Sequence, residues 1–243
     1  MRRLLLCLAA AGILIGAAAS AARADDIIFQ RHRLQFTYND YQPWNALGVN
    51  NFNVTNGTTA LSADGLVTTT IDFGRGGPGS TMLECPATNC TWSGNFAPKQ
   101  SLLASYDANT ERGEGAITLD FSQGLAGVGF QIQANEYGTF EAEIEGFDGG
   151  TPLGTFFASG DSTDGEHNTA IFLGLEDLTG ADITSLRVLA FNCGGGESDC
   201  CDGFAINRVL FGTTATPEPA SLLLLGSAVT ALGFLRRKLF SRS

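Results

Sequence analysis

The feature that most constrains the fold is a strict alternation of apolar and polar residues in one short segment. Within residues 140–147, three apolar side chains alternate with three glutamates: Phe140, Ala142 and Ile144 against Glu141, Glu143 and Glu145. Successive side chains of a β-strand point to opposite faces, so this period predicts a strand with one face in a core and one in water. Half-buried strands of this kind are typical of antiparallel sheets.

The same pattern continues through much of the chain. We expect a strand in the β-branched run at residues 66–73 and a short helix near residues 101–105. Seven later segments predict strands, with glycine and polar turn residues between them: 116–121, 128–134, 140–147, 153–158, 169–174, 183–191 and 204–211. Strands that recur at such intervals predict an all-β domain, an antiparallel β-sandwich or jelly roll, with a closed barrel as the second choice.

The first part of the domain has weaker patterns. Residues 27–38 alternate in part, which predicts a strand with three side chains on one face: Leu34, Phe36 and Tyr38. Residues 40–65 are rich in Asn, Gly and Thr, so we expect irregular surface there, with Trp44 as an aromatic anchor.

The N-terminus has the three parts of a signal peptide. Arg2 and Arg3 precede an apolar run, and Ala22-Arg23-Ala24 supplies a small-residue cleavage pattern. This order predicts that residues 1–24 form a signal helix that the Sec translocon exports and that is cleaved from the chain. The alternative is an uncleaved membrane helix, for which the apolar stretch is short.

The C-terminal segment, residues 213–243, is built as a membrane tail. Its Pro-Glu-Pro motif precedes the apolar run 221–235, and a basic cluster follows. We expect a short transmembrane helix in the inner membrane, with the basic end in the cytoplasm by the positive-inside rule. The residues that define the tail are Pro217, Glu218, Pro219, Arg236 and Arg237.

This order of Pro-Glu-Pro, leucine-rich helix and arginine-rich end resembles the PEP-CTERM sorting signal of Gram-negative bacteria. The resemblance implies recognition by an exosortase and a final place at the cell surface or in the extracellular matrix, with exopolysaccharide and biofilm. It covers only the last 27 residues, so it implies an address rather than an activity. The alternative is a plain tail anchor. Residues 116–211 also resemble the lectin-like jelly rolls found ahead of such tails.

The segment between the two ends, residues 25–212, is long enough for one domain and is strongly acidic. Only one of the chain's 25 acids lies outside it, in the tail, whereas seven of the 14 bases lie in the two ends. Its net charge is therefore near −17. Nucleic-acid binding needs a basic footprint and is excluded, whereas cations, neutral sugars and basic partners remain open.

Five cysteines remain after export, and an oxidising compartment favours their pairing. Cys85 and Cys90 bracket a turn-rich spacer, and Cys193 lies within reach of Cys200 or Cys201 around a glycine-rich loop. One thiol is left over, and cross-pairing between the two clusters is an alternative. A zinc site is a further alternative, although no histidine lies beside either cluster.

No catalytic motif occurs in the chain, so we predict that it is not an enzyme. A polysaccharide hydrolase, which would use a pair of carboxylates, remains a third hypothesis after a matrix protein and a lectin-like carbohydrate-binding module. For that module the candidate stacking platforms are Trp44 and Trp92, with Tyr41 and Tyr106 as further aromatics.

Calcium is the ligand that best suits the acidic loop at residues 161–166. Asp161, Asp164 and Glu166 surround a glycine there, and carboxylate oxygens suit a hard cation. Asp199 and Asp202 form a second candidate. The alternative is an ordinary Asp/Gly turn, so a structural Ca²⁺ is an expectation, and no cofactor is required.

Overall fold

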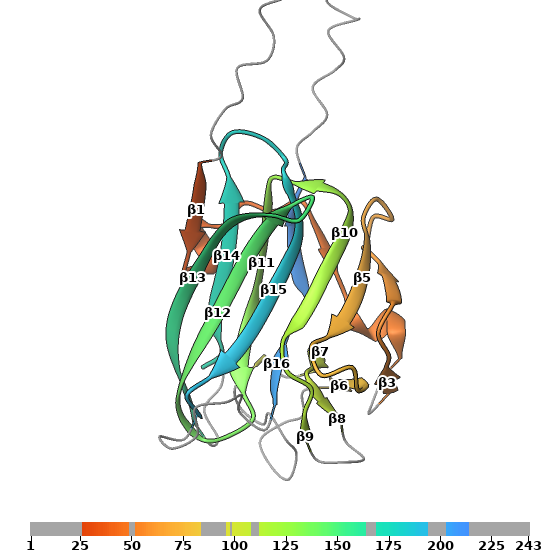
Figure 1. Cartoon of the computed structure of the whole chain (residues 1–243), viewed down its shortest axis with the longest axis vertical. Coiled ribbons are helices and arrows are strands. Elements are labelled where there is room, and N and C mark those ends of the chain that lie inside the picture. Colours follow the sequence, from red (N-terminus) through yellow and green to blue (C-terminus); the bar gives the residue numbers. More distant parts are fainter. Residues whose placement is uncertain are drawn as a thin grey trace, which may run out of the picture.

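The computed structural model describes residues 26–48, 52–83, 96–97, 99–107, 112–163, 169–193 and 203–213. Two antiparallel sheets pack face to face in this part of the chain and form a β-sandwich (Figure 1). The predicted all-β antiparallel sandwich is thereby confirmed. The signal helix and the tail helix predicted at the ends lie outside the described residues. Within those residues, no helix has the length and apolar character needed to cross a membrane.

The smaller sheet has six strands and lies in front in Figure 1. Every ladder in it is antiparallel. Its strands, in spatial order, are β13 (Thr151–Ser162), β12 (Gly138–Asp148), β15 (Ile183–Phe191), β10 (Ile117–Leu125), β5 (Thr68–Phe73) and β4 (Thr58–Leu61).

The larger sheet has nine strands and lies behind. Its main path is β1 (Ile27–Gln30), β14 (Ile171–Asp177), β11 (Gly127–Ala134), β16 (Phe204–Ile206), β7 (Ser101–Ala104), β6 (Gly79–Leu83) and β3 (Phe52–Val54). Strand β17 (Val209–Gly212) pairs with β11, and β2 (Asp40–Gln42) pairs with β17. A separate hairpin joins β8 (Tyr106–Asp107) to β9 (Arg112–Gly113). Two 3-10 helices, η1 (Arg33–Gln35) and η2 (Trp44–Leu47), complete the described elements.

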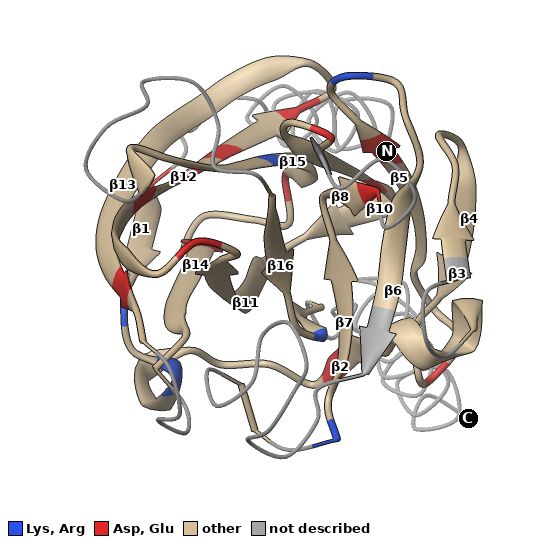
Figure 2. Ribbon diagram, turned by 90° about the horizontal axis from the view of Figure 1, so that it is seen from below, with Lys and Arg blue, Asp and Glu red and all other residues tan. Residues whose placement is uncertain are grey.

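The core lies between the sheets because the strands alternate as their sequences predict. One row of directly paired residues crosses four strands of the smaller sheet and is buried throughout: Ile144, Val188, Ile117 and Phe73. The larger sheet faces this row with Phe130 and Ile132 of β11. Figure 2, which views the molecule from below, shows the two sheets curving around this core.

The strand predicted over residues 27–38 is only partly correct. Strand β1 ends at Gln30, and η1 follows it. Leu34 is fully exposed on this helical turn and Tyr38 is also exposed, whereas Phe36 is buried. The 3-10 turn breaks the period of two, so the three residues do not share a face.

Three other local predictions were wrong. Residues 40–65, expected to be irregular, contain η2 and three short strands, whose pairing is supplied by distant segments. Residues 101–104 form strand β7 rather than a helix, because β6 and β16 flank them in the sheet. The predicted strand 204–211 is two strands, β16 and β17, which are interrupted at Asn207 and Arg208.

Both ends of the described domain lie at the same end of the nine-stranded sheet (Figure 1). The amide of Leu178 donates to the carbonyl oxygen of Asp26 over 3.2 Å, and the amide of Asp177 donates to that of Ala126 over 2.8 Å. The amide of Ala126 in turn donates to the carbonyl oxygen of Gly212 over 2.8 Å. The first and last strands are therefore separated only by β14 and β11.

Candidate functional site

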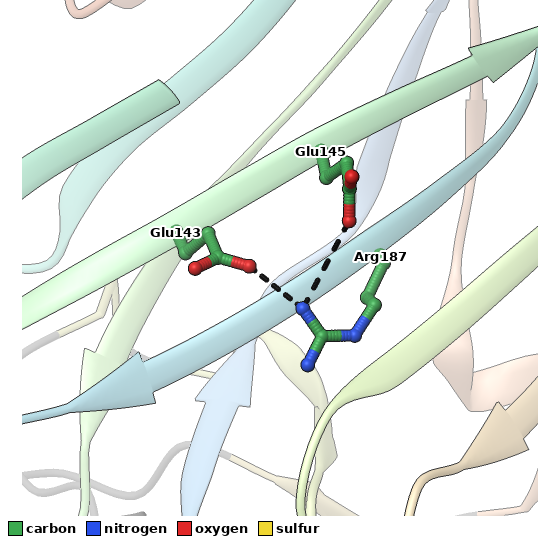
Figure 3. Close-up of polar contacts among 3 residues, drawn as sticks. All are labelled: Glu143, Glu145 and Arg187. Carbon is green, nitrogen blue, oxygen red and sulfur yellow. Dashed lines mark hydrogen bonds and ion pairs between the residues drawn. The ribbon is translucent and has the colours of Figure 1, made fainter. Parts of the chain in front are cut away.

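The outer face of the six-stranded sheet carries the glutamates of β12. Arg187 of β15 lies between two of them: its Nη1 is 2.7 Å from Glu143 Oε1 and 4.0 Å from Glu145 Oε2 (Figure 3). Asn192 donates a hydrogen bond to Glu141 over 3.0 Å. The predicted solvent-facing glutamate face is thus observed, with a cross-strand arginine that offsets part of its repulsion.

Further acids extend this face to the neighbouring strands. Burial raises the pKa of Asp120 above its ordinary value, and the negative charge of Asp72 raises it further, while a hydrogen bond with Ser185 opposes both effects. The carboxylates of β5 and β10 are therefore close enough to repel each other. This face of the sandwich disfavours an anionic ligand.

On the opposite side of the molecule, Asn207 organises the outer surface of the nine-stranded sheet. Its side chain is almost completely buried at the break between β16 and β17. The amide of Gln131 donates to Asn207 Oδ1 over 2.8 Å. Asn207 Nδ2 donates to Gln131 Oε1 over 2.9 Å and to Gln100 Oε1 over 3.3 Å. One side chain thus links β11 to the segment that precedes β7.

Trp44 contacts Asn207 from the core side of the sheet. Its indole Nε1 donates to the carbonyl oxygen of Asn207 over 2.8 Å, and the side chain is 0% exposed. The sequence-based prediction of Trp44 as a sugar-stacking platform was therefore wrong, because both the ring and its N–H are used in the core.

Arg208 projects from this break onto the outer surface. Its guanidinium carbon lies 5.3 Å from the centre of the Tyr41 ring, a cation–π distance. Tyr41 belongs to β2, which is held beside β17 by main-chain pairing of Tyr41 with Leu210. The arginine is half-buried and is thus oriented by an aromatic ring rather than by a carboxylate.

Farther along the same face, the chain around η1 lies across β14 and β11. Phe36 packs against Phe172 with ring centres 5.6 Å apart. Glycines beneath the two rings provide the space, since a Cβ on Gly129 would lie 2.6 Å from the Phe172 ring and one on Gly174 would lie 3.1 Å from Phe36. This contact places Arg33 on the outer surface.

Two pockets lie on this outer surface. One, of about 610 Å³, is lined by Arg31, His32 and Arg33 together with residues of β13 and β14. The other, of about 290 Å³, is lined by Lys99 and Arg208 with Tyr41, Asn45 and Gln100. A third depression, with no room for a water molecule, shares Arg33 with the first pocket and Arg208 with the second.

We call the two pockets and the depression that adjoins both the basic groove and define it by six residues: Arg31, His32, Arg33, Lys99, Gln100 and Arg208. Four of the seven bases between residues 25 and 212 line it. Within the described part of the chain, ion pairs involve Arg187 alone, so the four groove bases have no carboxylate partner there. Figure 2 shows acidic segments on both sheets, and basic segments along the outer side of the nine-stranded sheet as well as on β15 and on a loop at the top of the view.

The predicted calcium site is only partly within the described residues. Asp161 lies in strand β13, paired with Thr139, rather than in a loop. Asp164 and Glu166, like Asp199 and Asp202 of the second candidate, lie outside the described residues. No cluster of three or more metal-ligating side chains occurs among those that are described, so calcium binding stays a prediction.

The remaining predicted site residues are also largely outside the described part. Cys193 is buried just after β15, with its sulfur 3.8 Å from the carbonyl oxygen of Phe191. The other four candidate disulfide cysteines, Trp92 and the five sorting-motif residues lie outside the described residues, so their predicted roles remain predictions: Cys85, Cys90, Cys200, Cys201, Trp92, Pro217, Glu218, Pro219, Arg236 and Arg237.

Sequence reasoning missed the basic groove entirely. Its bases are scattered over residues 31–208 and form no motif, and the net negative charge of the domain favours cations and basic partners as ligands. The signal available in the sequence was the scarcity of bases. Because the domain has only seven, several of them on one surface would indicate a binding site. The pairing of β1, β14, β11, β16, β17 and β7 in one sheet brings them together.

Comparison with known proteins adds information on sorting. Residues 215–238 match the PEP-CTERM protein-sorting motif, which confirms the resemblance of the tail. No curated protein matches the chain. Among solved structures, a DUF4465 family protein from Bacteroides caccae has a TM-score of 0.38 and 11% sequence identity, over 76% of this chain and 99% of that chain. The sorting motif marks the chain as an exported protein that an exosortase processes.

Proposed function

We propose that this exported chain, with its PEP-CTERM protein-sorting motif, is a non-catalytic carbohydrate-binding protein retained in extracellular polysaccharide. Export and exosortase processing follow from the motif at residues 215–238. The retention role is the further step, and the basic groove is the observation that carries it. An exosortase would release or transfer the domain, so a binding surface would be needed to keep it with the matrix.

A binding role is supported over hydrolysis by the placement of the carboxylates. Glycoside hydrolases flank the scissile bond with two carboxyl groups in a cleft. Here Glu143 and Glu145 share Arg187 on an open sheet face, and the pockets on the other face are lined by bases. The groove therefore suits recognition of a polar chain rather than its cleavage.

Fractionation of a host that carries an exosortase tests the proposal. We expect the full-length chain to be processed and recovered with extracellular polysaccharide, and to be released when that polysaccharide is digested. Glu218→Ala should leave unprocessed chain in the membrane fraction, because it removes the acidic residue of the sorting motif. Asp148→Ala, which removes an exposed acid from the end of β12, is the matched control and should behave as the unaltered chain.

Recovery of the processed protein free in the medium, with no change upon polysaccharide digestion, would contradict the retention role. Release of reducing sugars from the polysaccharide by the purified protein would contradict the non-catalytic role. Sorting itself is tested separately, by the size of the chain in each fraction.

A further inference from the structure

We infer that the basic groove binds an acidic polysaccharide, with carboxylate-bearing sugars of one chain held at both of its ends. Arg31 and Arg33 would hold one acidic sugar, and Lys99 and Arg208 would hold another. The inference rests on the proposed function, because it specifies the chemistry of the carbohydrate that this exported domain would retain.

The charge distribution supports an anionic ligand. Between residues 25 and 212 acids outnumber bases 24 to 7, so an arrangement governed by internal pairing would place a carboxylate beside each base. Arg187 has such a partner, whereas Arg31, Arg33, Lys99 and Arg208 have none among the described residues. Guanidinium groups form strong, bidentate hydrogen bonds with carboxylates, so these bases form a site with unused binding capacity.

The shape of the groove supports a polymer rather than a single small anion. The two pockets adjoin the depression lined by Arg33 and Arg208, and both are open to solvent. Strand β14 lines one pocket and β7 the other, and these two strands are separated by β11 and β16, so at the usual strand spacing they lie roughly 14 Å apart. A small anion would occupy one pocket, whereas an extended chain would contact the bases of both.

The groove is also preorganised, which lowers the entropy cost of binding. Tyr41 orients Arg208, and Asn207 links the strands beneath it. Asn45 and Gln100 line the pocket beside these bases and supply amide groups suited to sugar hydroxyls.

The acidic outer face of the six-stranded sheet disfavours binding of an acidic polymer on that side of the molecule. The opposite sheet presents Glu141, Glu143 and Glu145, together with Asp72 and Asp120. An acidic polymer would be repelled by these carboxylates and attracted by the bases of the groove. At physiological salt both forces extend over a Debye length of about 8 Å. One protein would therefore hold one acidic chain on one side.

Binding of the processed protein, purified from the extracellular fraction, to polygalacturonate and to neutral dextran tests the inference. We expect polygalacturonate to bind more tightly, with an affinity that falls as salt rises. Arg208→Gln and Arg33→Gln should each weaken its binding about tenfold, the loss expected for one charge-assisted contact. Arg187→Gln makes the same charge change on the acidic face and should alter binding less than twofold.

Each outcome bears on a different claim. Binding to dextran but not to polygalacturonate would overturn the acidic specificity and leave the proposed function intact. Binding to neither polymer, nor to the host's own polysaccharide, would contradict both. Equal loss of binding in Arg187→Gln would show a general charge effect and overturn the groove assignment. Tighter binding to vesicles of anionic phospholipid than to polygalacturonate would also overturn the inference that the ligand is a polysaccharide. Thermal unfolding of each variant identifies any that fails to fold, and the lysine variant at the same position, which keeps the charge but loses the bidentate hydrogen bonds, then replaces it.

Discussion

Single buried polar residues determine how the outer surface of the nine-stranded sheet is built. Asn207 satisfies main-chain and side-chain groups from two other segments, and its own carbonyl oxygen accepts the indole N–H of Trp44. Buried polar groups of this kind are costly when a partner is removed, because the remaining groups keep their desolvation penalty. The groove depends on this residue even though Asn207 carries no charge.

Replacement of Asn207 by alanine tests this dependence. We expect the free energy of unfolding to fall by at least about 2 kcal/mol, since Gln131 and Gln100 lose their shared partner. Asn45→Ala is the matched control, because Asn45 is exposed and its replacement should change stability by less than about 0.5 kcal/mol. Urea unfolding measures both. Equal stability of the two variants would contradict a structural role for the Asn207 network.

Asp40 provides a second test at the level of one residue. Burial raises the pKa of this carboxyl, and a hydrogen bond with Asp64 raises it further. The same contact lowers the pKa of Asp64. Since the folded state holds the Asp40 proton more tightly than the unfolded state, this group costs stability as the pH rises from about 4 through its raised pKa.

Asp40→Asn should therefore be more stable than the unaltered chain at pH 7 and should lack this loss of stability with rising pH. The asparagine keeps an oxygen for the amides of Tyr41 and Asp64, which Asp40 Oδ1 accepts over 2.7 and 3.3 Å. Unfolding free energies at pH 4 and pH 7 measure the effect. A variant that is less stable than the unaltered chain at pH 7 would show that the ionised carboxylate is favourable.

At the scale of elements, the contact between the η1 segment and the sheet depends on glycines, which have no side chain. The rings of Phe36 and Phe172 lie where Gly129 and Gly174 leave room on β11 and β14. Phe172 is therefore the side chain that must move if the strand beneath it gains a Cβ. This close approach, rather than a hydrophobic period, holds Arg33 on the outer surface.

A double-mutant cycle tests this packing. Gly129→Ala alone should destabilise the protein by about 1–3 kcal/mol, because its Cβ would lie 2.6 Å from the Phe172 ring. In a Phe172→Ala background the same change should cost at least about 1 kcal/mol less, since the opposing ring is gone. Additive costs, measured by urea unfolding, would show that the two positions do not contact each other.

At the scale of the whole molecule, the close approach of the two ends gives a prediction about topology. Strands β1 and β17 are separated by β14 and β11, so residues 26 and 213 lie roughly 14 Å apart. A Gly/Ser linker of about eight residues spans that distance. The exposed turn at Gly149 and Gly150 offers a place for new ends.

A permuted domain joined in this way and opened between Gly149 and Gly150 should keep a cooperative thermal transition and a β-type circular dichroism spectrum. The matched control has the same linker but is opened between Phe130 and Gln131, inside β11, and should not fold. If both permutants unfold cooperatively, or neither does, the inferred proximity of the ends is wrong.

Much of the fold was predictable from local sequence. Alternation over residues 140–147 predicted β12 and placed Ile144 in the core, because a period of two depends only on near neighbours, and the strand predicted over residues 183–191 is β15. Short strands such as β2 and β7 were missed, since their conformation is set by partners far away in the chain.

The chain's sequence by itself determined how the protein is sorted and its layered all-β architecture. Both depend on contiguous patterns: a sorting motif at residues 215–238, and strands whose apolar faces must be buried. Only the tertiary structure decided that Trp44 is core and that Arg33 and Arg208 line one groove. The physical reason is that a charge acts through space, so residues far apart in the chain form a site only after the sheets bring them together.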